Sequence, residues 1–459
     1  MPLKTKTSKI RPLTDKLPAD IIEAFKVPLG QMRSIIKDFH SEMVKGLSGK
    51  RSSLKMIPGF VDKPTGRESG EFIALDLGGT NLRVLLIKLK RRGRISVRRE
   101  KGFILRKAHT AGSSRELFDF IASAIKRFCE EQKFDVKKTV SMGFTFSFPV
   151  RQLGVAQGRL LSWTKEFSTR GVIGRDVVKL LQEALMRQGL ENFKISALVN
   201  DTVGTLAAAA YADPRCDIGV ILGTGTNACY RERTSRITKW RGKGSVGKWM
   251  IVNIEWGNFN KLRRTEYDRL LDASSSNPGE QVLEKMVSGM YLSEVAGIVI
   301  TGLVSRGAIS VHRGLRAFKR SNGFTSEDLS IIEADSSLNL SSVGSVLKRF
   351  GAGNSSLQDR RLIQDACNVV SRRASRISAA AVAAVVTKID PGLSDEHTIA
   401  VDGSLYEKHP GFSINMRSAL REIFGKKSSR INIVLSKDGS GRGAAVIAAI
   451  ASNIKENGS

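Results

Sequence analysis

The sequence predicts an α/β protein with two similar lobes that face a cleft. A unit of strand, glycine-rich turn and strand occurs twice, at residues 71–89 and 217–232. Segments with apolar residues at helical spacing follow each unit. The 459 residues suffice for two lobes, and 41% hydrophobic with 26% charged residues is typical of a soluble globular protein.

The first half of the chain alternates helices and strands. Apolar residues recur at helical spacing over 18–48, and proline and glycine interrupt residues 56–70, which predicts helices and then a linker. Ser113 or Ser114 precedes an acidic first turn and predicts the start of an amphipathic helix. The remaining elements expected here are strands at 71–76, 82–89, 94–105 and 139–147 and a helix at Asp176–Arg187.

The second half repeats this pattern. A strand at 194–199 leads into a helix that opens with "NDTVGT", and the second strand–turn–strand unit follows. Further on we expect long helices at about 280–302 and 359–388, and two strands, within 398–406 and 432–450, that each lead into a glycine-containing turn. The second of these turns opens directly into a helix.

The chain is strongly basic, with a net charge of +30 and a pI near 10.2. Such a field attracts polyanions, including nucleic acid, anionic membranes, acidic proteins and phosphorylated substrates. No nucleic-acid-binding motif accompanies the charge, so we interpret the dense stretches as solvated loops and hairpin tips. These stretches are Lys88–Lys101, Arg231–Lys248, Arg313–Arg320 and Arg421–Arg430.

Cysteine and histidine usage argues against disulfides and against a histidine-held metal. The four cysteines are scattered and form no CxxC pair, so buried reduced thiols are expected at Cys129, Cys216, Cys229 and Cys367. The longest apolar candidate, residues 379–386, is too short to cross a bilayer and is interpreted as a buried helix. Residues 1–14 are basic and free of acids, and we expect a short disordered segment there.

Glycine-rich turns are the first candidate functional feature. "LDLGGTNLR" (75–83) lacks the Walker A spacing, and "GTGTNA" (223–228) lacks the third glycine of a dinucleotide fingerprint. Both turns nevertheless offer backbone N–H groups and hydroxyls, from Thr80 and Thr224, that can hold phosphate from two sides. "DGSGRGAA" (438–445) opens a helix, whose N-terminus also favours anions. Together these features predict a nucleotide site.

The second candidate feature is "LVNDTVGT", where Asn200 and Asp201 lie at a strand-to-helix junction. One interpretation is a simple helix N-cap. The other is a general base, because a carboxylate at the C-terminal end of a strand can take a proton from a bound hydroxyl.

Nine motifs in one order resemble the hexokinase family, and plant hexokinases most of all. These motifs are "LDLGGTN-R", "GFTFSFP", "WTK-F", "VNDTVGT", "GTGTNACY", "NIEWGNF", "EKMVSGMYL", "VDGSLYEKHP" and "DGSGRGAA". The resemblance covers about residues 20 to 450. It implies a two-lobed actin-like (ribonuclease H-like) sugar kinase fold in which a hexose and Mg-ATP meet in the cleft between the lobes. We expect a large domain of residues 1–69 plus 200–440 and a small domain of residues 70–199 plus 441–459.

The resemblance also implies roles for individual residues. Asp201 would deprotonate the 6-hydroxyl of the hexose, Lys165 would stabilise the transferring phosphoryl group, and Asp76 and Asp201 would hold Mg²⁺ through water. The sugar would bind Ser147, Thr164, Lys165, Asn200, Asp201, Asn227, Glu255 and Glu284. The nucleotide would bind Asp76, Gly78, Gly79, Thr80, Asn81, Arg83, Gly223, Thr224, Gly225, Gly403 and Ser440.

The chain departs from the family pattern at a few positions. Glu166 replaces the usual glycine after the sugar-binding lysine, which places a negative charge beside Lys165 and strains the backbone if that glycine has positive φ. Leu82 replaces a phenylalanine that is usual in the family, and Ser293 replaces a usual glycine. Lys248 and Trp249 lie in a loop that is less basic in relatives.

Three hypotheses follow. The favoured one is an ATP-dependent kinase that phosphorylates glucose, and also fructose or mannose, for glycolysis. Glu166 and the charge motivate the alternative of a weak or inactive glucose-binding sensor or regulatory protein. A polyanion-binding role, through weak contacts with an anionic surface or acidic protein, can accompany either. We expect a monomer in the cytoplasm, and the mitochondrial surface, plastid and nucleus are the alternatives.

Overall fold

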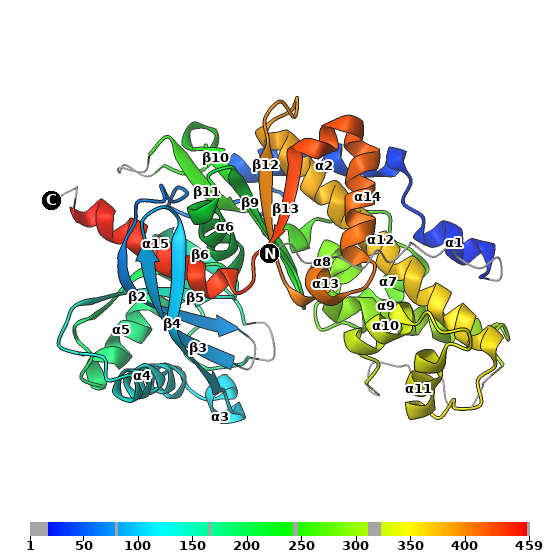
Figure 1. Ribbon diagram of the computed structural model, residues 1–459, viewed down its shortest axis with the longest axis horizontal. Helices are drawn as coiled ribbons and strands as arrows, with labels where there is room; N and C mark the ends of the chain where they lie inside the picture. Colours follow the sequence, from blue (N-terminus) through cyan, green and yellow to red (C-terminus); the bar gives the residue numbers. More distant parts are fainter. Residues whose placement is uncertain (1–16, 79–80, 164–166, 242–246, 311–322, 457–459) are drawn as a thin grey trace.

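The structure is a computed structural model that describes residues 17–78, 81–163, 167–241, 247–310 and 323–456. Two separate β-sheets lie in the two lobes (Figure 1), and β6 and β7 form a third, two-stranded antiparallel sheet. One has five strands in the order β4-β3-β2-β5-β8, and the other has six in the order β1-β11-β10-β9-β12-β13. The strands are β1 (Ile57–Pro58), β2 (Gly70–Gly78), β3 (Asn81–Lys90), β4 (Arg94–Ile104), β5 (Val140–Phe146), β6 (Val150–Gly154), β7 (Gln157–Leu160), β8 (Phe193–Val199), β9 (Cys216–Leu222), β10 (Thr226–Arg233), β11 (Trp249–Asn253), β12 (His397–Asp402) and β13 (Ile431–Leu435).

The two sheets share one plan. In the five-stranded sheet, β2, β3 and β4 are antiparallel, and β5 and β8 continue parallel to β2. In the six-stranded sheet, β9, β10 and β11 are antiparallel, and β12 and β13 continue parallel to β9. This repeat confirms the two similar lobes predicted from the recurring strand–turn–strand units.

The first hairpin resolves the interruption between the strands predicted at 71–76 and 82–89. β2 and β3 pair continuously from Gly70 opposite Leu89 to Gly78 opposite Asn81. The strand is therefore not broken but folded back on itself. The two residues between its arms, Gly79 and Thr80, lie outside the described part of the chain.

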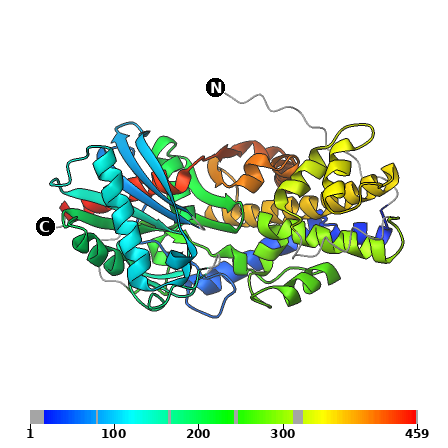
Figure 2. The same cartoon turned by 90° about the horizontal axis from the view of Figure 1, so that it is seen from below.

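Fifteen α-helices lie among the described residues, and α9 to α12 gather at the end of the molecule away from the five-stranded sheet (Figure 2). They are α1 (Ala19–Phe25), α2 (Leu29–Leu47), α3 (Lys107–Ala111), α4 (Ser114–Glu131), α5 (Val177–Arg187), α6 (Asp201–Ala212), α7 (Glu266–Ser274), α8 (Val282–Val287), α9 (Gly289–Ser305), α10 (Ser326–Ala334), α11 (Ser341–Arg349), α12 (Leu357–Ile389), α13 (Ser404–Lys408), α14 (Phe412–Phe424) and α15 (Gly439–Glu456).

Local signals account for several helix boundaries. Ser113 and Glu116 form the capping box predicted for α4, and the side chain of Asp176 caps α5. The single helix predicted at about 280–302 was wrong, because the chain breaks at Ser288 into α8 and α9. The break lets the backbone N–H of Gly289 donate to the carbonyl of Gly223, 2.8 Å away. A tertiary contact thus overrides a helical pattern.

Successive side chains of β2 point to opposite faces of the five-stranded sheet and pack against different helices. Ile73, Leu75 and Leu77 face one hydrophobic cluster, which contains α4 and α5. Phe72 and Ala74 face another cluster, which contains the alanine-rich part of α15 together with α6. α15 therefore covers this sheet on the side opposite to α4 and α5.

Helices α6 and α15 contact each other closely between the lobes. A Cβ atom on Gly204 of α6 would lie only 2.8 Å from the carbonyl oxygen of Ser440 in α15. Only glycine permits this approach. α6 also packs on β9, whereas α15 packs on β2 and β5, so the two helices join the sheets. We keep the division into a large domain (1–69 plus 200–440) and a small domain (70–199 plus 441–459) as a proposal.

All four cysteines are buried and free, as predicted. Within the described ranges, no helix is both long enough and apolar enough to cross a membrane.

Candidate active site

Asp76 and Arg83 form the centre of the expected phosphate-binding region. They are directly opposite each other in the β2–β3 hairpin, and Arg83 Nη2 donates to Asp76 Oδ2 at 2.6 Å. The hydroxyl of Ser440 donates to the same oxygen at 3.0 Å. Arg83 Nη1 also binds Asp438 at 2.7 Å, just before α15. Burial opposes the charge of Arg83, but these carboxylates raise its pKa further above its ordinary value, so the guanidinium stays charged.

The second glycine-rich turn, Gly223–Gly225, is held by backbone contacts. The carbonyls of Gly223 and Thr224 accept hydrogen bonds from the first two N–H groups of α9, at 2.8 and 3.2 Å. A Cβ atom on Gly223 would lie 3.4 Å from the Cα atom of Gly403, so these turns are in contact. Gly403 has φ +121°, and a Cβ atom there would collide with the carbonyl oxygen of Leu222. The position therefore requires glycine.

A continuous series of contacts joins the two turns. Gly223 contacts Gly403, the neighbouring Asp402 accepts from the backbone N–H of Gly439 at 3.0 Å, and Ser440 binds Asp76. Burial raises the pKa of Asp402. The predicted nucleotide residues on β2, β3, the Gly403 turn and the start of α15 therefore lie in one region, although distant parts of the sequence supply them.

Asn200 and Asp201 lie where β8 ends and α6 begins, as predicted. Asn200 is the N-cap, and its Oδ1 accepts from the backbone N–H of Thr202 at 3.0 Å. Asp201 Oδ1 accepts from the same N–H group at 2.8 Å. Both side chains are partly exposed. The capping interpretation thus holds for Asn200, while Asp201 sits in the first turn, where the helix dipole stabilises negative charge.

A network of amides and a carboxylate surrounds Asn227. Its Nδ2 donates to Asn253 Oδ1 at 2.9 Å and to Glu255 Oε1 at 3.2 Å, and Asn253 donates to Glu255 at 2.8 Å. Glu255 has φ +56° and ψ +52°, a left-handed conformation that costs energy for any residue with a side chain. Glu255 is therefore a fixed member of a polar network rather than an ordinary surface acid.

Glu284 in α8 lies beside the second turn. Its Oε2 accepts from the backbone N–H of Thr226 at 3.0 Å, and a Cβ atom on Gly225 would lie 2.9 Å from that oxygen. Because Asn227 is the next residue along β10, the predicted sugar residues Asn227, Glu255 and Glu284 are brought together.

Of the remaining predicted residues, some lie at the two turns and others lie outside the described part of the chain. Ser147 follows β5, and its hydroxyl would lie 3.9 Å from a Cβ atom on Gly78, which places it next to the first turn. Asn81 and Thr224 are exposed at their turns. Gly79, Thr80, Thr164, Lys165 and Glu166 lie outside the described residues.

Three polar residues in these contacts were not singled out from the sequence. Asn253, Asp402 and Asp438 stand inside or next to recognised motifs, in "NIEW", "VDGS" and "KDGSG". The motif signal was present, but only the tertiary contacts with Glu255, Gly439 and Arg83 reveal what each side chain binds.

The residues present fit a magnesium ion that is carried by a nucleotide. Among the residues that the structure describes, no group of three or more histidine, cysteine or acidic side chains could hold a metal by itself. Mg²⁺ prefers one or two carboxylates together with phosphate oxygens and water. Both hydrogen bonds described for the Asp76 carboxylate use Oδ2, so Oδ1 can face such an ion.

Fold and site together define a phosphoryl-transfer enzyme of the two-lobed actin-like class. Family models described as hexokinase match residues 18–211 and 217–450. The chain is 42% identical to the protein named Hexokinase-2 of Oryza sativa subsp. japonica, covering 96% of this chain and 92% of that protein. It is 40% identical to the Arabidopsis thaliana protein named Hexokinase-2, covering 94% and 89%.

A solved structure supports the same family. The Schistosoma mansoni hexokinase complexed with glucose superposes with a TM-score of 0.84 at 36% identity, covering 94% of this chain and 97% of that one. The chain belongs to the hexokinase family. It is an ATP-dependent hexose kinase, as the ordered motifs predicted.

Proposed function

We propose that this chain transfers the γ-phosphoryl group of Mg-ATP to the 6-hydroxyl of glucose, with fructose and mannose as further substrates. The observation that carries this proposal is the position of Asp201, partly exposed in the first turn of α6 and adjacent to the N-cap Asn200. The glucose in the Schistosoma mansoni structure supports the choice of hexose.

Asn227, Glu255 and Glu284 would hold the hexose. Carboxylates accept hydrogen bonds from sugar hydroxyls, and amides both donate and accept. The existing bonds among Asn227, Asn253 and Glu255 fix these groups before the sugar arrives, which lowers the cost of binding. Ser147, Asn200, Thr164 and Lys165 complete the proposed set.

The proposed reaction moves one proton and one phosphoryl group. Asp201 accepts the proton of the 6-hydroxyl as that oxygen forms a bond to the γ-phosphorus, and the bond from the γ-phosphorus to the β-phosphate oxygen breaks to release ADP. Asp76 and Asp201 would hold the magnesium ion through water, and bound magnesium neutralises charge that develops on the phosphates. Arg83 orients Asp76, and Ser440 and the Gly403 turn face the nucleotide.

Replacement of Asp201 tests this proposal. We expect Asp201→Asn to lower kcat by about 10² to 10⁴-fold, the usual contribution of a general base, while glucose still binds. The assay couples glucose 6-phosphate to its dehydrogenase, and calorimetry measures glucose binding. Glu191→Gln, an exposed acid before β8, is the matched control and keeps full activity. Turnover that survives in Asp201→Asn would refute the role of the base, and glucose binding without turnover in the unmodified chain would favour the sensor alternative.

A further inference from the structure

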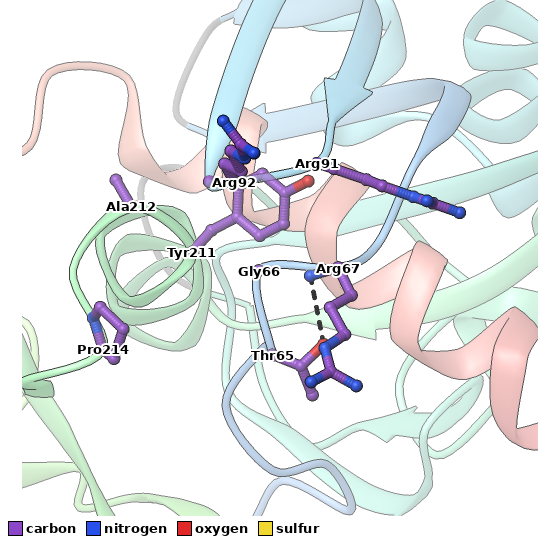
Figure 3. A pocket seen from close by; sticks show the side chains of 9 residues that line it. Thr65, Gly66, Arg67, Arg91, Arg92, Tyr211, Ala212 and Pro214 are labelled. Carbon is purple, nitrogen blue, oxygen red and sulfur yellow. Dashed lines mark hydrogen bonds between the residues drawn. The ribbon is translucent and has the colours of Figure 1, made fainter.

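A large cavity lies where three segments meet (Figure 3). It adjoins the Lys90 end of β3, whereas the first glycine-rich turn lies at the opposite, Asn81 end of that strand. Its volume is about 790 Å³. The walls are residues 65–67 of the linker, residues 91–93 at the tip of the β3–β4 hairpin, and Tyr211, Ala212 and Pro214 at the C-terminal end of α6. Its size lies within the range of small-molecule sites in proteins.

Hydrogen bonds fix these walls to one another. The buried Tyr211 hydroxyl contacts the carbonyl oxygens of Glu68 in the linker and of Lys90 at the end of β3, the latter at 2.9 Å. The backbone N–H of Arg92 donates to the carbonyl of Gly66 at 2.9 Å. Lys63 Nζ donates to the carbonyl of Pro214. The cavity is therefore part of the folded framework, and a ligand would not need to order it.

Three arginines, Arg67, Arg91 and Arg92, line the cavity and are exposed. Their guanidinium groups point in different directions around it rather than toward one point (Figure 3). A ligand that contacts two of them must therefore carry more than one anionic group.

The acids near the cavity are already paired with other groups. Asp62 binds Arg231 through two contacts of 2.6 and 2.7 Å, and Asp213 binds Arg215 at 3.0 Å. The buried carboxylate of Glu68 accepts from the backbone N–H groups of Thr65 and Gly66, each at 2.9 Å. Across the described ranges, none of the three arginines forms an ion pair with a carboxylate.

The C-terminus of α6 offers a competing explanation for the positive charge. Helix C-termini attract cations through the dipole and the last carbonyl groups. In the part of the chain that the structure describes, however, no guanidinium of these arginines donates a hydrogen bond to an α6 carbonyl, and one helix end does not require three cations. The charge is therefore available to a ligand.

We propose that this cavity binds a small soluble anion that carries at least two phosphate groups. Guanidinium groups bind phosphate oxygens with two parallel charge-assisted hydrogen bonds, and a compact molecule with several phosphates offers such acceptors in several directions. The concave, preformed walls fit a compact molecule. The site is separate from the nucleotide region at Asp76 and Ser440, so occupancy of one does not exclude the other.

Calorimetric titration of the full chain with inorganic tripolyphosphate tests this proposal. The solution contains about 0.15 M salt, which screens weak surface attraction, and saturating glucose with a non-hydrolysable ATP analogue, which occupies the active site. We expect one tripolyphosphate to bind. The triple variant Arg67→Ala, Arg91→Ala, Arg92→Ala should bind at least about tenfold more weakly, since charge-assisted contacts are lost.

A matched control removes the same number of charges from β4, the strand that follows the hairpin tip. Arg94, Arg98 and Arg99 lie on β4, and none of them lines the cavity. Arg94→Ala, Arg98→Ala, Arg99→Ala should keep the dissociation constant of the unmodified chain. Thermal unfolding checks that both variants fold, and Arg67→Gln alone provides a milder variant that should also weaken binding.

Three results would overturn the proposal. Equal weakening in the two triple variants would show a diffuse attraction to the basic hairpin. Binding that occurs only in a parallel titration without the ATP analogue would place the probe in the active site. Absence of tripolyphosphate binding in both titrations would exclude a soluble polyphosphate, and co-sedimentation on phosphatidylcholine vesicles that contain phosphatidylinositol bisphosphate would then assign the arginines to a lipid headgroup.

Discussion

Arg83 connects parts of the site that are far apart in the sequence. It contacts Asp76 on the neighbouring strand and Asp438, which is 355 positions away, before α15. The guanidinium thus holds Asp76, the acid proposed for magnesium, and Asp438, which lies just before α15. Ser440 in the first turn of α15 contacts Asp76 as well. A lysine would have to make both contacts from a single nitrogen, because it lacks the planar fork of donors.

We predict that Arg83→Ala raises the KM for ATP by about tenfold or more, because each hydrogen bond to a charged group contributes about 1.5–3 kcal/mol. Glucose binding, measured by calorimetry, should not change. Arg99→Ala, on the adjacent strand β4, serves as the control for lost charge. An unchanged KM for ATP in Arg83→Ala would remove Arg83 from the nucleotide site.

We predict that Glu166→Gly increases kcat by about fivefold, which corresponds to relief of about 1 kcal/mol of charge repulsion. The negative charge of Glu166 stands next to Lys165 in the sequence and would oppose the incoming phosphates. Glu166→Gln removes the charge but keeps the side chain, so it separates charge from backbone strain. Equal steady-state rates in all three proteins would show that the position tolerates glutamate.

At this scale, sequence motifs located the chemistry but not its partners. Asp201 and Asn200 were predicted at the strand-to-helix junction where they lie, because the apolar strand and the cap are local signals. The bond between Arg83 and Asp438, and the bond from Asn253 to Glu255, depend on tertiary packing. No local pattern encodes such pairs.

At the scale of elements, the turns between strands and helices position the site. The Gly403 turn ends β12, contacts the Gly223 turn and precedes α13. Its backbone conformation and its lack of space both demand glycine. Glycine at position 403 thus allows the backbone of this turn to contact the backbone of Leu222 and Gly223.

We predict that Gly403→Ala lowers the free energy of unfolding by about 2 kcal/mol or more, since strain at positive φ adds to a steric collision. Gly307→Ala is the matched control: Gly307 has φ +72°, and no atom lies within 4 Å of the position that a Cβ atom would take there. This control should cost only about 1 kcal/mol. Urea denaturation measures both, and equal losses would show that the contact with Leu222 is unimportant.

His397 joins β12 to β9 and to the loop after α12. Its Nδ1 lies 2.7 Å from Asp217 Oδ2, and its Nε2 lies 3.4 Å from Asp390 Oδ2. The hydrogen bond with Asp217 raises the pKa of His397 above its ordinary value, although burial opposes the shift. The folded state therefore favours the protonated imidazole.

The consequence is a pH-dependent contribution to stability. It is fully present below the unfolded pKa of about 6.5 and is lost as pH rises through the higher folded value. We predict that the free energy of unfolding decreases more between pH 6 and pH 9 in the unmodified chain than in His397→Gln. Urea denaturation at several pH values measures this difference. The same decrease in the free energy of unfolding with pH in both proteins would show that His397 does not cause it.

At the scale of the whole molecule, one sheet plan occurs twice and α6 and α15 join the two copies. The recurring strand–turn–strand unit allowed the two lobes to be predicted from sequence, because glycine turns and apolar strands are local features. The break at Ser288 could not be predicted, since it depends on the bond between Gly289 and Gly223, which lie in different elements. The large cavity likewise arises from three segments that meet only in the fold.

The central claim is that this chain phosphorylates the 6-hydroxyl of glucose. Phosphorus NMR of the unmodified chain with glucose and Mg-ATP tests it most directly, because the spectrum reports both the donor and the position of the new ester. We predict one ADP for each glucose 6-phosphate formed. Unchanged ATP in a sample in which calorimetry shows bound glucose, or a phosphate ester at another carbon, would contradict it.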